Sequence, residues 1–457
     1  MDRSMFRWWK ADVRKRKIAL ITFIIVCWVL WFQSQRAKYK SHGFIHSAYY
    51  FAQSKSLGKN AIAIVMTIDR NYLWDYQKIK LIGSNSMGTE EFRTRISVES
   101  DRSEDDFVTV LVQSVNKNEG MDHLEKLELE SNGIKFEIPF KTISSTPSHP
   151  VVLCYSPQRI SENWQNFLLQ THLAKYFWAH SHYYVEGITQ PFYNLLRSLD
   201  ERSVTIQPWM HHQKSSAGAV YTNCLLQYKE KTEYVVFLDS DDVMLPSGAD
   251  SYYEEFMRLF GGHPLVTSLR YSQYQMDIAF EGAWEKYSIS RGIRGSTWRK
   301  GALEDIGKLV VRTDMYNSTG AIVSETANTR WNSRITKKVP NAVYHLNPVE
   351  TQPNSNSTAI PMSPLRNIPL LREYQLEDIE RDWKLLKNRS GTREIVEKLP
   401  NRRYFTAFFR SSTPLSQPDD LQCLVSSSVI QSKSDKYRLI FHFPTEQPSL
   451  VPATDCF

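Results

Sequence analysis

The residues best suited to chemistry lie in one short acidic segment, residues 239–242, with the sequence Asp-Ser-Asp-Asp. The apolar run Tyr234–Leu238 comes directly before it. A β-branched and aromatic run that is closed by polar residues and a proline, here Pro246, predicts a buried strand that ends at a sheet edge. Asp239 and Asp241 would then offer hard oxygen ligands to a divalent cation that also binds a diphosphate, as in a nucleotide-sugar site. A solvated acidic turn is the alternative interpretation.

Strand and helix patterns alternate on both sides of this segment. Strands are expected at 151–155, 182–185, 204–206, 234–238 and 309–311, and helices at 162–176, 192–199, 221–229 and 252–260. This alternation predicts an α/β fold with a doubly wound mixed sheet over residues 149–350. Residues 61–148 instead contain short alternating runs separated by turns, which predict a small β-rich module. Residues 351–457 are expected to form a C-terminal extension that is irregular apart from a charged helix at 373–387.

The amino-terminal region predicts a membrane anchor. Residues 18–32 are apolar except for Thr22, and basic residues are denser before this run than after it. A spanning helix usually needs about 20 residues, so we place a signal anchor at 18–35, with a cytoplasmic tail at 1–17 and a stem at 36–60. No small-x-small pair follows the run, which argues against cleavage of a signal peptide. We therefore expect a single-pass type II protein of the Golgi or endoplasmic reticulum membrane with a luminal catalytic domain.

The cysteines and the glycosylation sequons bear on whether the body of the protein is luminal. The cysteines outside the apolar run are Cys154, Cys224, Cys423 and Cys456. They allow two disulfides in three possible pairings, or buried thiols instead. Asn-x-Ser/Thr sequons occur at Asn317, Asn356 and Asn388, which agrees with a luminal location without deciding it. The formal net charge of +7 is modest, and no basic block interleaved with aromatics appears in the body, so nucleic-acid binding is not expected.

An ordered set of motifs between about residue 150 and residue 350 resembles glycosyltransferase family 92. The set comprises the Val-Leu-Cys-Tyr-Ser-Pro stretch at 152–157, Trp164, Tyr-Tyr-Val at 183–185, Val-Thr-Ile-Gln-Pro-Trp at 204–209, Cys-Leu-Leu-Gln-Tyr-Lys at 224–229, and Phe-Leu-Asp-Ser-Asp-Asp at 237–242 with Pro246. The resemblance implies a GT-A fold and an inverting transferase that uses UDP-galactose and Mn²⁺. It implies a glycan acceptor, with fucose on the core of N-glycans as the acceptor of characterised nematode relatives.

The resemblance also implies roles for particular residues. Asp239 and Asp241 are similar to the family's ligands of the metal and the diphosphate, and His345 is similar to its C-terminal histidine, which would either complete the metal shell or contact the diphosphate. Ser156 and Pro157 resemble the edge of the uridine pocket. An inverting transfer also needs a carboxylate that deprotonates the acceptor. We favour Glu304 and Asp305 among several acidic residues, because both come shortly before a predicted strand.

Two positions depart from the family pattern. Asn223 stands before Cys224 where an aspartate is usual, and the Val-Val-Arg-Thr-Asp segment at 310–314 is not followed by the expected histidine. These departures motivate an alternative function, a catalytically weak paralogue that acts as a luminal glycan-binding or enzyme-partner protein. A calcium-dependent surface module is a further alternative, which the strand and helix alternation disfavours.

Overall fold

The structure is a computed structural model of the full chain. It describes residues 20–31, 41–70, 79–100, 107–114, 123–131, 134–144, 146–160, 164–199, 203–209, 217–278, 280, 284–300, 308–317, 336–348, 371–389, 391–396, 422–425, 428–434, 439–444 and 449–452. All structural statements below concern these residues.

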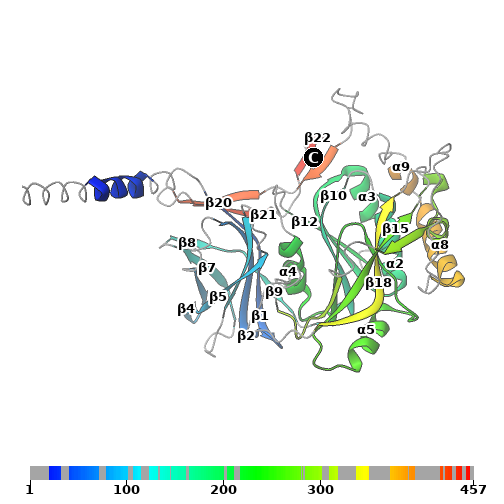
Figure 1. Ribbon diagram of the computed structural model, residues 1–457, viewed down its shortest axis with the longest axis horizontal. Coiled ribbons are helices and arrows are strands. Elements are labelled where there is room, and N and C mark those ends of the chain that lie inside the picture. Colours follow the sequence, from blue (N-terminus) through cyan, green and yellow to red (C-terminus); the bar gives the residue numbers. More distant parts are fainter. Residues whose placement is uncertain are drawn as a thin grey trace, which may run out of the picture.

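Two packed sheets form the amino-terminal half of the body (Figure 1). The first sheet has the order β20-β21-β1-β2-β6-β5, and β9 also pairs with β1; its strands from this half are β1 (Ser41–Ser54), β2 (Gly58–Asp69), β5 (Thr94–Ser100), β6 (Phe107–Ser114) and β9 (Lys141–Ile143). The second sheet contains β3 (Lys80–Asn85), β4 (Gly88–Phe92), β7 (Lys126–Ser131) and β8 (Ile134–Glu137). The predicted strands of the β-rich module are therefore present.

Strand β1 corrects the prediction of a stem at 36–60. Residues 43–54 pair with β2, and Tyr49, Tyr50 and Phe51 are fully buried. The register of this pairing shifts between Ile45 and Ser47. Such an irregularity breaks the alternation of inward and outward side chains, so the segment does not read as a strand in the sequence.

The second half of the body is a large mixed sheet with the order β14-β18-β15-β17-β13-β10-β11-β19-β22, with β12 paired to β11 and β16 to β15. Its strands are β10 (Val151–Ile160), β11 (His180–Thr189), β12 (Val204–Pro208), β13 (Tyr234–Leu238), β14 (Asp242–Met244), β15 (Ser268–Ile278), β16 (Thr297–Lys300), β17 (Lys308–Arg312), β18 (Thr336–Pro348), β19 (Gln422–Val425) and β22 (Ser449–Pro452). Strands β13, β10, β11 and β12 are parallel. The prediction of a mixed α/β architecture is confirmed.

Helices cover both faces of this sheet. They are α2 (Trp164–Tyr176), α3 (Gln190–Arg197), α4 (Ala217–Tyr228), α5 (Tyr252–Gly261), the 3₁₀ turn η3 (Trp284–Lys286), α6 (Ile289–Arg294), α8 (Glu373–Lys387) and α9 (Thr392–Val396). Leu153 of β10 packs in one core with α2, α3 and α5, whereas its neighbours Val152 and Cys154 pack in another with α4. Successive residues of a strand point to opposite faces, so the part of β10 that is covered on both faces, residues 151–155, needs apolar residues at every position.

Helix α4 lies between the large sheet and the β-rich module (Figure 1). Asn223 of α4 joins the two: its amide Nδ2 donates to Tyr184 OH of β11 over 2.8 Å, and its Oδ1 accepts from Tyr49 OH of β1 over 2.8 Å. Cys224 forms a disulfide with Cys154 of β10. The asparagine that departs from the family pattern is therefore a buried link between the two halves of the molecule, and one of the possible cysteine pairings is present.

The carboxyl-terminal region corrects the prediction of an irregular extension. Helix α8 has the predicted bounds, and its Trp383 is fully buried against Trp284 and Tyr287. Beyond it, β19 and β22 extend the large sheet, while β20 (Ser428–Ser434) and β21 (Leu439–Pro444) extend the first sheet through parallel pairing of β21 with β1. Strands β19 and β21 attach this region to β11 and β1, which lie hundreds of residues away in the sequence, so local patterns do not reveal the pairing.

Residues 20–31 of the predicted anchor are helical, and their large apolar side chains are exposed. The remainder of the anchor at 18–35 lies outside the described residues. Within the described part of the chain, no helix has both the length and the apolar character that a membrane crossing requires.

Candidate functional site

The acidic turn, residues 239–242, lies at the carboxyl end of β13, as the sequence predicts. Strand β10 is parallel to β13, with Tyr155 opposite Leu238, so the carboxyl ends of both strands meet at this edge. The turn is closed by two hydrogen bonds: Asp242 N donates to Asp239 O over 3.1 Å, and Asp239 N donates to Asp242 Oδ2 over 2.8 Å. The carboxyl edge of parallel strands is where open α/β sheets bind ligands.

Asp242 anchors the turn from within and is completely buried. Its Oδ2 accepts from Asp239 N and from the Lys308 ammonium at 3.0 Å, and its Oδ1 accepts from His345 Nδ1 at 3.0 Å and Gln273 Nε2 at 3.3 Å. Burial alone raises the pKa of Asp242, but the hydrogen bond from His345 and the charge of Lys308 outweigh it, and the pKa is lowered. All four partners are donors, so this carboxylate is ionised and has no capacity left for a ligand.

Asp239 and Asp241, in contrast, are accessible. The Asp239 side chain is 43% exposed; its Oδ1 accepts from Tyr221 OH at 2.8 Å and its Oδ2 pairs with Lys308. Asp241 is half-buried, and its Oδ1 accepts from Asn166 Nδ2 at 3.1 Å. Because an ionised carboxylate offers about four acceptor positions, both side chains retain capacity for a ligand from solvent.

His345 lies beside the turn because β18 pairs with β14, which places it opposite Asp242. Asp242 accepts only, so His345 Nδ1 carries the proton in this contact and Nε2 is the other coordinating position. Burial acts against it, but the hydrogen bond to Asp242 raises the pKa of His345. A carboxylate that fixes one imidazole nitrogen is the usual support of a metal-binding histidine.

These residues fit a divalent cation only if other ligands help to hold it. Among the described residues, no three side chains of His, Cys, Asp or Glu form a group that could hold a metal ion by themselves. Asp239 and Asp241 are oxygen donors of the kind that Mn²⁺ accepts, and His345 adds an acceptable nitrogen. Such an ion would take its remaining ligands from water and a diphosphate, as is usual for cations that accompany nucleotides.

The other predicted residues divide into two groups. Ser156 and Pro157 are half-buried in β10, next to the point where Tyr155 pairs with Leu238. The structure therefore places both at the edge that carries the acidic turn. Glu304 and Asp305 lie outside the described residues, so their assignment as the catalytic base stays a prediction.

The family is established by comparison with known proteins. The sequence profile of glycosyltransferase family 92 matches residues 149–386, which is more than half of the chain. The chain belongs to glycosyltransferase family 92. Three glycosyltransferase family 92 proteins of Caenorhabditis elegans are 29%, 27% and 30% identical to this chain, over 89%, 89% and 78% of it and over 88%, 88% and 74% of their own lengths.

Several residues that contact the acidic turn were not predicted from the sequence. Lys308 precedes the predicted strand 309–311 by one residue, and Asn166 and Gln170 lie on buried positions of α2. Gln170 Nε2 donates to the backbone oxygens of Ser240 at 2.7 Å and Asp242 at 3.0 Å. Polar residues four positions apart on the buried face of an apolar helix were a signal for this contact, because buried amides need partners.

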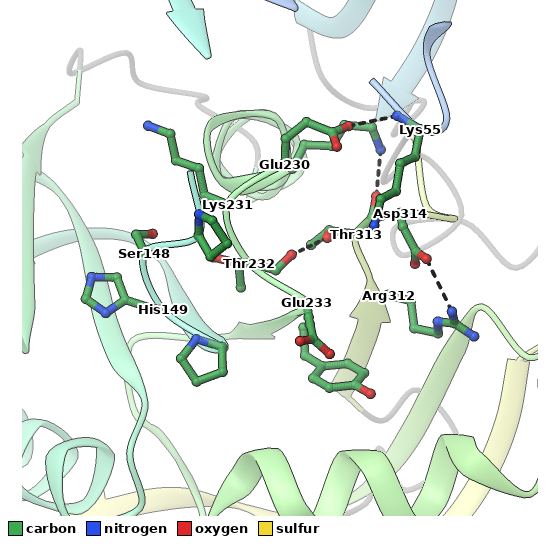
Figure 2. A pocket seen from close by; sticks show the side chains of 14 residues that line it. Lys55, Ser148, His149, Glu230, Lys231, Thr232, Glu233, Arg312, Thr313 and Asp314 are labelled. Atoms are coloured by element: carbon green, nitrogen blue, oxygen red, sulfur yellow. Dashed lines mark hydrogen bonds and ion pairs between the residues drawn. The ribbon is translucent and has the colours of Figure 1, made fainter. Parts of the chain in front are cut away.

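The opposite edge of the glycosyltransferase sheet contains a cavity of about 500 Å³, between the start of β13 and the β1–β2 turn (Figure 2). Charged side chains of both signs line it, among them the ion pair of Arg312 with Asp314 at 3.2 Å. Lys229 is fully buried at its wall, and its ammonium donates to the carbonyls of Thr313 at 2.9 Å and Tyr316 at 2.6 Å. This burial lowers the pKa of Lys229 to about 7.

The burial of Lys229 predicts a pH-dependent stability. The pKa of Lys229 is about 7 in the folded protein and ordinarily 10.5, so the unfolded chain binds more protons between these two pH values. Above the unfolded pKa of Lys229, folding costs nothing for this charge. As the pH falls towards 7, the unfolded state is favoured by its extra proton, so the folded protein becomes less stable. We expect the unfolding free energy of the wild type, relative to Lys229→Met, to rise by about 2 kcal/mol from pH 7 to pH 9. Chemical denaturation at the two pH values measures it, with Lys231→Met as the control that should show no such change.

Proposed function

We propose that this glycosyltransferase transfers galactose from UDP-galactose to a glycan acceptor, with inversion and with Mn²⁺, from a GT-A-type domain. The observation that carries the proposal is the acidic turn: two accessible carboxylates, Asp239 and Asp241, held at the carboxyl edge of the parallel strands by a third, buried carboxylate. The family supports glycosyl transfer in general. The identities of the donor, the metal and the acceptor go beyond the family and are proposed here.

Each residue of the site has a role in this scheme. Asp239, Asp241 and His345 would hold the metal ion, which, when bound, neutralises the departing diphosphate as a Lewis acid. Asp242 orients His345 and fixes the backbone of the turn, and Asn166 orients Asp241. Ser156 and Pro157 would border the uridine, since they lie on the neighbouring strand at the same edge.

The acceptor half of the reaction requires a base. Inversion needs a carboxylate that removes the proton of the acceptor hydroxyl on the face opposite the diphosphate. Glu304 and Asp305 are the proposed candidates, because they come shortly before β17, which carries Lys308 into contact with the acidic turn. Fucose on an N-glycan core is the proposed acceptor.

The proposed location is the Golgi or endoplasmic reticulum, with residues 18–35 as the membrane anchor and the body in the lumen. The buried disulfide between Cys154 and Cys224 supports an oxidising compartment, since disulfides are rare in proteins of the cytosol. The apolar, exposed side chains of the helix at 20–31 suit a lipid environment.

The test is calorimetric titration of the full-length protein in detergent with UDP-galactose and with other UDP-sugars, with Mn²⁺ and with EDTA. Metal-dependent binding that is tightest for UDP-galactose, followed by transfer to a core-fucosylated N-glycan, is the expected result. Tighter binding of another UDP-sugar would identify that UDP-sugar as the donor in place of UDP-galactose. Binding of the glycan without turnover of any donor would instead favour the non-catalytic paralogue.

A further inference from the structure

The side chain of Lys308 lies against the acidic turn. Lys308 is the first residue of β17, and its side chain is 14% exposed. Its ammonium contacts Asp239 Oδ2 and lies 3.0 Å from Asp242 Oδ2. Among the described residues, no other lysine or arginine forms an ion pair with the turn. Lys308 therefore offsets part of the charge of the carboxylates.

The contact with Asp239 differs from the contact with Asp242. Asp242 is fully buried and saturated with donors, so its pairing with Lys308 is part of the structure of the turn. Asp239 is 43% exposed, and its Oδ2 is an oxygen through which this residue would coordinate a metal ion. A divalent cation that binds this oxygen must weaken the ion pair with Lys308.

The same ammonium is placed to interact with a diphosphate. A diphosphate that approached carboxylates alone would be repelled by them. An ammonium has three donors, and two point to Asp239 and Asp242. The third can donate to a phosphate oxygen, a charge-assisted hydrogen bond of the stronger kind.

We propose that Lys308 is a donor-site residue with two opposite effects: it competes with a divalent cation for Asp239, and it binds the diphosphate of the nucleotide-sugar. The proposal rests on the proposed function, because it takes the acidic turn as the donor site. It assigns part of the stabilisation of the leaving group to the protein chain itself, and it predicts that free metal binds weakly until the diphosphate adds its own ligands.

The test measures Mn²⁺ and UDP separately on the full-length protein. Lys308→Met removes the charge at similar length, Lys308→Gln keeps a donor for Asp242 without the charge, and Lys308→Arg keeps the charge. Lys175→Met is the matched control, because Lys175 forms its ion pair with Asp382 of α8 and not with a residue of the turn. Mn²⁺ binding without nucleotide is measured by electron paramagnetic resonance, and UDP binding at saturating Mn²⁺ by calorimetry. Thermal unfolding identifies which neutral variant is folded.

The expected result is a pair of opposite shifts. In the folded neutral variants, Mn²⁺ should bind at least about tenfold tighter and UDP at least about tenfold weaker than in the wild type, the size expected for one hydrogen bond to a charged group. Lys308→Arg and Lys175→Met should stay near the wild type. Mn²⁺ affinity that is unchanged or reduced, or unchanged UDP affinity, overturns the proposal. If wild-type protein binds UDP at no Mn²⁺ concentration, the proposed function itself fails, whereas wild-type binding without the opposite shifts removes the role of Lys308 alone.

Discussion

Replacement of Asp241 by asparagine is expected to lower the rate of sugar transfer at least about 100-fold, the scale of losing one ligand that stabilises developing charge. The protein should fold as the wild type does, because Asp241 is half-buried and its described side-chain partners are the neutral groups of Asn166 and Ser240. Asparagine keeps an oxygen that Asn166 can donate to, but it lacks the charge that a cation requires. Transfer assays, together with UDP binding at saturating Mn²⁺, measure the effect.

The control for this variant is Asp378→Asn. Asp378 is an accessible aspartate of α8, paired with Arg381 on the helix surface, and its loss should change neither transfer nor the unfolding temperature. Asp241→Asn protein that transfers sugar at the wild-type rate would exclude Asp241 as a ligand of the metal or the diphosphate.

Asp242→Asn is expected to destabilise the protein by about 3–5 kcal/mol, the cost of breaking a buried charge network. The four groups around Asp242 are all donors: the backbone N–H of Asp239, Lys308, His345 and Gln273. An asparagine has the same shape, but its NH₂ group must face one pair of these donors. The largely buried Lys308 and the half-buried His345 would then lack the charge that compensates them, and the pair of donors that the NH₂ group faces would lose its hydrogen bonds.

Chemical denaturation of Asp242→Asn beside Asp241→Asn separates a structural carboxylate from a ligand. The expected pattern is a large loss of unfolding free energy for Asp242→Asn and a small one for Asp241→Asn, with transfer lost in both. Equal stability of the two variants would show that the buried network does not support the turn.

The architecture of the catalytic half was predictable from the sequence because its signals are local. The run Tyr234–Leu238 is apolar at every position, as a strand with helices on both faces requires, and α8 shows its helical spacing over its full length of Glu373–Lys387. The carboxylates that follow β13 must lie at the end of that strand, whatever the rest of the chain does. The position of the candidate site at the sheet edge therefore follows from the buried strand and from the acidic residues directly after it.

Non-local pairing decided the parts of the fold that the sequence did not reveal. Strand β1 contains an irregularity that hides its alternation, and it lies between β2 and β21, which come from opposite ends of the chain. Strands β19 and β21 join the two sheets through β11 and β1, and β22 and β20 pair with them in turn. Because β-pairing depends on partners and not on intrinsic preference alone, such edge strands cannot be located from their own residues.

By itself, the sequence determined that Asp239, Asp241 and Asp242 lie together after a buried strand and favoured Asp239 and Asp241 as ligands, but nothing in the residue types distinguishes one carboxylate from another. Only the tertiary structure separated them, because β14, β15, β17 and β18 bring His345, Gln273 and Lys308 from distant segments to one buried carboxylate. Burial then decides the role of each: the saturated Asp242 supports the turn, and the accessible Asp239 and Asp241 can bind. The sequence shows which residues are acidic, whereas the fold determines how far each carboxylate is exposed to water and which groups it contacts.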